Sequence, residues 1–194
     1  AFGKEVQDLV HDILGYDKFQ GWDSQIAGEA TLNLYSTQRR RLTVIAPNED
    51  TFAVDGFYEW RLALGNYFTG ASVGGLVRFG WNLPLSFSDA RLSTVAYSHQ
   101  PFTAAREDVS GFSWYGIAGF LVTGVVHDIT LDGPVFRRYD SEVTSRAVVA
   151  EVYAGFGVSI GRWNLSYVHT FRTKEFKGQH DAPVFGSATI GYRI

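Results

Sequence analysis

Hydrophobic and polar residues alternate with a period of two along most of this chain. From Phe52 to Leu64 the even-numbered positions are mostly apolar, whereas the odd-numbered positions include Asp55, Glu59 and Arg61. This period places alternate side chains on opposite faces of a β-strand, so the segment predicts one apolar and one charged face. The same alternation predicts further strands at about 30–43, 67–79, 112–126, 148–160, 163–171 and 184–194.

The length of these segments indicates the class of sheet. Most run for about ten residues or more, with aromatic residues near segment ends, which is typical of the wall of an outer-membrane β-barrel with lipid on one side and a polar lumen on the other. No stretch approaches the roughly 18 consecutive apolar residues that a membrane helix needs. The alternative is a soluble sandwich, whose strands average about five or six residues. We therefore predict an all-β, antiparallel transmembrane barrel in the bacterial outer membrane.

The number of predicted strands is too small for a complete barrel. Seven segments are clear, and single-chain bacterial barrels have an even number of strands. Either an eighth strand lies in residues 85–98, or strands that precede Ala1 are absent from this chain. No linker or repeat divides the sequence, so we treat residues 1–194 as a single outer-membrane barrel domain. On the second alternative, this domain is a fragment truncated at its N-terminus.

A helical pattern interrupts the alternation near the N-terminus. Its apolar stripe consists of Val6, Leu9, Val10 and Ile13. Gln7 and His11 are one helical turn apart on another face, and Gly15 is placed to end the helix. We expect the helix to rest on its apolar stripe and to present an amide and an imidazole together. Imidazole is suited to proton transfer near neutral pH, although a solvated surface pair is the simpler alternative.

Three other groups of residues carry less chemical information. Residues 70–74 fit a G-x-S-x-G pattern, but strand continues on both sides of Ser72, so a serine nucleophile is rejected. Arg39, Arg40 and Arg41 close an early strand and either meet lipopolysaccharide phosphates or form a solvated rim. The histidines at 99, 127 and 169 show no metal-ligand spacing.

Composition removes some classes of function. The sequence contains no cysteine, which excludes disulfides, thiolate zinc sites and a cysteine nucleophile. The formal net charge of -3 provides no basic field, so nucleic acid is not an expected partner.

Several blocks in order resemble a known family. They are "GKEVQDLVHDILG" and "GWDSQI" near the N-terminus, a strand that ends "RRR", "LDGPVFR" at 131–137, "LSYVHTFRTKEFKGQ" at 165–179 and the terminal "FGSATIGYRI". Together they are similar to the outer-membrane lipid A 3'-O-deacylase (LpxR) family over nearly the whole chain. The resemblance implies a twelve-stranded barrel, of which this chain would supply seven or eight strands.

The resemblance also implies an activity and a site. The expected reaction is hydrolysis of the ester-linked 3'-acyloxyacyl chain of lipid A by a water that His11 activates, with calcium assistance. Gln7, Trp22 and Gln25 match family positions that we assign to substrate binding. Family members carry an Asn/Asp pair and a hydroxyl residue on strands upstream of this helix, so we expect the chain to lack part of the site.

Two other functions stay open on sequence grounds. One is a non-catalytic outer-membrane barrel that binds lipopolysaccharide or is structural, and the other is a soluble lipid-carrying β-protein. The expected partners of the enzyme are lipid A or lipopolysaccharide and the outer-membrane lipids, and we expect a monomer. The metal ligands cannot be assigned from the sequence.

Overall fold

The computed structural model describes residues 2–14, 28–45, 51–83, 111–137 and 143–192. Its elements in chain order are α1 (Phe2–Leu14), β1 (Asn33–Ile45), β2 (Phe52–Gly65), β3 (Phe68–Trp81), β4 (Phe112–Asp128), α2 (Ile129–Asp132), β5 (Val148–Ile160), β6 (Trp163–Arg172) and β7 (Val184–Tyr192). Neither α1 nor α2, the helices in this part of the chain, is long and apolar enough to cross a membrane.

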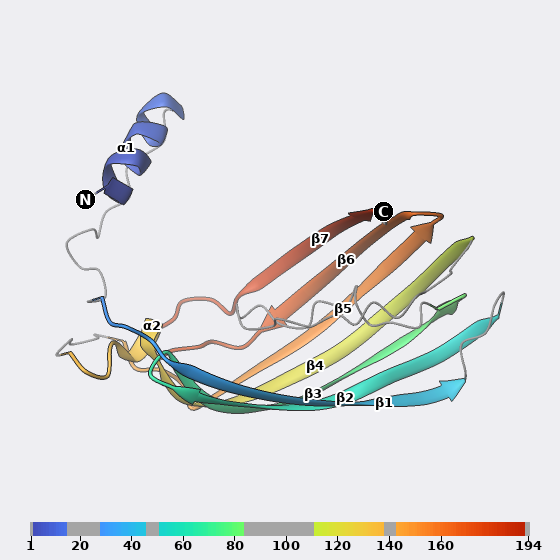
Figure 1. The fold of residues 1–194 in the computed structure, drawn as a ribbon, viewed down its shortest axis with the longest axis horizontal. Coiled ribbons are helices and arrows are strands. Elements are labelled where there is room, and N and C mark those ends of the chain that lie inside the picture. Colours follow the sequence, from blue (N-terminus) through green and yellow to red (C-terminus); the bar gives the residue numbers. More distant parts are fainter. Residues whose placement is uncertain (1, 15–27, 46–50, 84–110, 138–142, 193–194) are drawn as a thin grey trace.

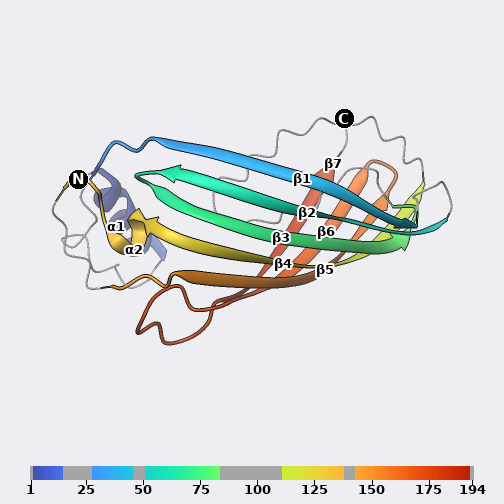
Figure 2. The same ribbon diagram turned by 90° about the horizontal axis from the view of Figure 1, so that it is seen from below.

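The seven strands form one antiparallel sheet in which every strand pairs with its neighbour in sequence. Figures 1 and 2 show the sheet as a deep trough, strongly curved and twisted from β1 to β7. Within the described residues β1 and β7 each pair with one strand, so the sheet is open. The predicted all-β antiparallel barrel wall with a short N-terminal helix is confirmed, and the candidate strand at 85–98 lies outside the described residues.

The two faces of the sheet follow the alternation in the sequence. On β2 the side chains of Asp55, Phe57 and Glu59 are buried on the concave face, whereas Leu62 and Leu64 are exposed on the outer face. The concave face also holds most of the buried apolar cluster, which includes Leu76, Tyr115, Ile117, Tyr153 and Val168. The outer face therefore leaves its large apolar side chains uncovered, as a lipid-facing wall does.

Aromatic residues collect on the outer face at one end of the sheet. This is the end away from α2, and we call the other end, where β4 leads into α2, the α2 end (Figure 1). The strand register places Phe52 beside Trp81 and Trp81 beside Trp114, and Trp163 beside Tyr192 with ring centroids 4.9 Å apart. Tryptophan and tyrosine in such a belt are typical of a membrane interface, where an apolar ring body meets a wet edge.

The N-terminal helix ends where the sequence predicts but does not have the predicted packing. It ends at Leu14, directly before Gly15. Figures 1 and 2 place α1 at the α2 end of the molecule, apart from the sheet. Its apolar stripe is exposed, with Ile13 at 73% and Leu9 at 59% of full exposure. Among the described residues nothing covers the stripe, so the expectation that α1 rests on it is wrong there.

Candidate functional site

The helix α1 carries the candidate general base. Glu5 lies in its first turn and complements the positive end of the helix dipole, and His11 lies in its last turn. The His11 side chain is half-buried, so water can reach part of the ring. Imidazole is the side chain best suited to proton transfer near neutral pH, so His11 is kept as a candidate base.

The other site residues predicted from the sequence are placed only in part. Gln7 lies on α1, one helical turn before His11, and nothing in the structure describes its side chain. Trp22 and Gln25 lie outside the described residues. Their assignment to substrate binding therefore stays a prediction.

Glu29, just before β1, fixes this part of the chain at the α2 end. The sequence analysis did not single out this residue. One carboxylate oxygen accepts a hydrogen bond from the Asn66 side-chain amide at 2.6 Å, and the other accepts from the Phe136 backbone N–H at 2.8 Å. Asn66 also donates to the Ala30 carbonyl and accepts from the Leu32 N–H. Glu29 thus joins the start of β1 to the β2–β3 turn and to the loop after α2, an arrangement that we call the Glu29 clasp.

The charge of Glu29 is favoured by this arrangement. Partial desolvation raises the pKa of the carboxyl, but hydrogen bonds from the Phe136 backbone, the Asn66 side chain and the Val135 backbone, with the nearby Arg137 charge, together hold the pKa of Glu29 below its usual value. The clasp joins "LDGPVFR", quoted above, to the chain just after "GWDSQI". Its partners are up to 107 positions apart, so no local pattern could have revealed it.

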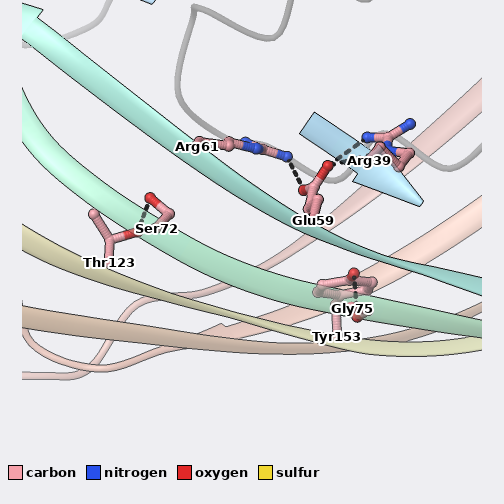
Figure 3. A network of polar contacts seen from close by, with 7 residues as sticks. All are labelled: Arg39, Glu59, Arg61, Ser72, Gly75, Thr123 and Tyr153. Atoms are coloured by element: carbon pink, nitrogen blue, oxygen red, sulfur yellow. Dashed lines mark hydrogen bonds and ion pairs between the residues drawn. The ribbon is translucent and has the colours of Figure 1, made fainter. Parts of the chain in front are cut away.

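The concave face near β1 and β2 holds two clusters of ion pairs. Arg39 and Arg61 both contact Glu59, one at each carboxylate oxygen (Figure 3). Asp55 takes two hydrogen bonds from Arg78 at 2.9 Å and one from Arg41 at 2.7 Å. These residues come from β1, β2 and β3, so the charges tie neighbouring strands together inside the trough.

The arginine run and the serine motif can now be placed. Arg39, Arg40 and Arg41 lie within β1, which continues to Ile45, so the prediction that they close the strand is wrong. Arg39 and Arg41 face the concave side and are engaged by carboxylates. Ser72 also faces this side, in the middle of a continuous strand, and its hydroxyl lies 2.9 Å from that of Thr123 (Figure 3). The rejection of a strand-to-helix nucleophile turn is confirmed.

The other histidines singled out in the sequence lie apart from one another or outside the described residues. His127 lies 3.9 Å from Asp132, and His169 packs edge-on against Phe171 at 4.8 Å on the outer face. His99 lies outside the described residues. Among the described residues no group of three or more histidine or acidic side chains is arranged to hold a metal ion.

These features define the class of protein. A curved antiparallel sheet with an exposed apolar outer face, an aromatic belt and a charged concave face is the wall of a transmembrane β-barrel. The family model described as outer membrane protein LpxR matches residues 1–194, and the chain belongs to this family of the bacterial outer membrane.

Comparison with solved structures supports the fold. LpxR from Salmonella typhimurium is similar, with a TM-score of 0.77 and 20% sequence identity over 99% of this chain. The match covers 62% of the Salmonella chain, so the present chain spans about three-fifths of that length. A comparison with curated proteins found no significant match.

Proposed function

We propose that the full-length protein is an outer-membrane lipid A deacylase that hydrolyses the ester-linked 3'-acyloxyacyl chain of lipid A. The observation that carries the proposal is the family match over residues 1–194, which includes the helix that bears Gln7 and His11. The place of α1 at the α2 end of the molecule supports it, because an ester near the headgroup of a lipid lies at the membrane surface rather than in the hydrocarbon.

The reaction needs a base, a held carbonyl and support for the developing oxyanion. The His11 imidazole takes a proton from water, and the water oxygen bonds to the acyl carbonyl carbon. The bond between that carbon and the sugar oxygen then breaks, and the proton passes to this leaving oxygen. The products are a free fatty acid and a free hydroxyl on the glucosamine. We assign Gln7, Trp22 and Gln25 to holding the lipid.

Calcium is part of the proposal through the family resemblance alone. A hard cation would supply positive charge at an ester carbonyl. The described residues contain no cluster of acidic or histidine side chains that fits such an ion. We therefore assign no calcium ligand among the described residues.

The test is an assay of the full-length protein on purified lipid A, with the released fatty acid measured by mass spectrometry. We expect release by the native protein and a loss of about 10²-fold or more in His11→Ala, since a general base contributes about 10²–10⁴-fold. His180→Ala is the matched control, because this imidazole is almost fully exposed on a loop. Absence of release by the native protein would favour the non-catalytic barrel that binds lipopolysaccharide. Equal release by His11→Ala would contradict the assigned base.

A further inference from the structure

The outer face of β1 differs from the rest of the wall. Arg39 and Arg41 point to the concave face, where Glu59 and Asp55 bind them. Because side chains alternate along a strand, Arg40 between them lies on the outer face, and it is exposed. Ser36 and Gln38 share that face and are exposed as well, so the three residues form a polar stripe, which we call the β1 stripe.

This stripe lies in the middle of an apolar surface rather than at its rim. The register places Ser36, Gln38 and Arg40 beside Leu62, Trp60 and Tyr58 of β2. Exposed apolar side chains precede and follow the stripe on the same face of β1, namely Leu34, Leu42 and Val44. A guanidinium at mid-strand that faced hydrocarbon without a counter-charge would be strongly unfavourable. An anionic group beside Arg40 would remove this cost.

The described part of the chain supplies no such partner. Apart from the backbone pairing of β1 with β2, Arg40 has no hydrogen bond or ion pair with the residues that the structure describes. The carboxylates within the paired strands at Asp55, Glu59 and Glu151 are buried on the concave face. Asp128 is at the end of β4, where it caps α2. A second copy of this wall would bring another Arg40 and no outer-face carboxylate from the described strands, which disfavours a symmetric contact.

We propose that the β1 stripe is a binding site for the phosphate group of an anionic membrane lipid. The planar guanidinium of Arg40 matches a phosphate with two parallel hydrogen bonds, and Gln38 and Ser36 add neutral donors on the same face. Trp60 and Tyr58 stack beside the stripe, with ring centroids 6.0 Å apart, and offer an apolar surface to the lipid chains. The long Arg40 side chain can extend along the wall toward the headgroup region. The site is on the opposite face of the sheet from the charged trough and is independent of the proposed hydrolysis.

Lipid retention by the full-length protein tests this site. The protein is reconstituted with phosphatidylcholine alone, with added phosphatidylglycerol, or with added lipopolysaccharide, and lipids that remain bound after gentle detergent release are identified by native mass spectrometry. We expect phosphorylated anionic lipid on the native protein and about tenfold less on Arg40→Leu. A hydrogen bond to a charged group changes the affinity by about tenfold or more. Arg40→Lys should retain an intermediate amount. Arg162→Leu, at the exposed β5–β6 turn, is the matched control and should retain the native amount.

A second measurement separates a binding site from a merely tolerated charge. In phosphatidylcholine alone Arg40→Leu should be more resistant to urea than the native protein, and addition of the anionic lipid should stabilise the native protein but not the variant. Retention on Arg40→Leu equal to the native amount would overturn the proposal. Disulfide-linked dimers of Ser36→Cys that Arg40→Leu abolishes would also overturn it, because they would assign the stripe to a second copy.

Discussion

At the scale of single residues, close packing between strands depends on the absence of a side chain at a few positions. Tyr153 of β5 lies across Gly119 of β4, and its hydroxyl donates to the Gly75 carbonyl of β3 at 3.1 Å (Figure 3). A Cβ at Gly119 would meet the Tyr153 ring and would lie 2.6 Å from the Gly75 carbonyl oxygen. The missing side chain at Gly119 thus leaves room for the Tyr153 ring to cross β4 and reach β3.

The substitution Gly119→Ala should therefore destabilise the folded protein. We expect a loss of about 1–3 kcal/mol in the free energy of unfolding, the usual cost of inserting a group into a filled site. Gly124→Ala is the matched control on the same strand, because the nearest atom to its added Cβ would be 3.8 Å away. Urea titration of the full-length protein in lipid vesicles measures both. Equal losses in the two variants would contradict the role of Tyr153.

The Glu29 clasp gives a second prediction at this scale. Glu29→Gln replaces one of the two acceptor oxygens by an NH2 group, so the side chain can no longer accept from both Asn66 and Phe136. The clasp is weakened, and hydrogen exchange in residues 133–137 should become faster. Because the folded-state pKa is lowered, the clasp contributes stability above the ordinary value of 4.5 and loses it as the pH falls through the lower folded value. The protection factors in residues 133–137, which are corrected for the pH dependence of intrinsic exchange, should therefore also fall on acidification below 4.5 in the native protein.

The matched control for the clasp is Glu5→Gln, since Glu5 is exposed on α1. It should leave exchange in residues 133–137 unchanged. Protection in this loop that does not respond to Glu29→Gln would show that other contacts hold the loop.

At the scale of elements, the sequence predicts on which face of a strand or helix a residue lies better than it predicts which other element that face contacts. The period of two assigns each strand residue to a face, and the exposed Phe120 and the buried Glu59 both follow it. The alternation does not predict the hydrogen-bond register between strands. The pairing of Arg39 with Glu59, for example, depends on the length of the intervening turn. The packing of α1 could not be deduced from its stripe, because amphipathicity shows that a face is apolar but does not show what covers it.

The same limit applies to the candidate site. Gln7 and His11 were found because they share one helix, where spacing alone determines a common face. Glu29 was missed because its partners come from distant loops. Local periodicity reports secondary structure and says little about which loops meet at the end of a sheet.

The trough ion pairs yield a prediction for β1, β2 and β3 as a unit. Asp55→Ala would leave Arg78, which is 2% exposed, without its carboxylate partner. Loss of one member of a buried pair costs about 3–5 kcal/mol, so we expect the free energy of unfolding to fall by that amount. Arg41→Ala is the control at the same cluster, and its more exposed side chain should cost about 1 kcal/mol or less. A small effect of Asp55→Ala in urea titration would show that water already screens the trough.

At the scale of the whole molecule, the outer face of the sheet is the face that meets lipid. Val73 is exposed near the middle of β3, and Val148 is exposed at the start of β5. An arginine that faces lipid costs about 2–4 kcal/mol at the bilayer midplane and about 0–1 near the interface. Val73→Arg should therefore be markedly less stable in vesicles than Val148→Arg. Equal stability of the two variants would contradict a lipid-facing wall.

The proposed hydrolysis can be tested by following the oxygen of the attacking water. The full-length protein is incubated with lipid A in water enriched in oxygen-18, and the products are examined by mass spectrometry. Attack of a His11-activated water on the acyl carbonyl predicts one heavy oxygen in the released fatty acid and none in the new sugar hydroxyl, with both products lost in His11→Ala. Heavy oxygen in the sugar hydroxyl, or an intact lipid A, would contradict the account.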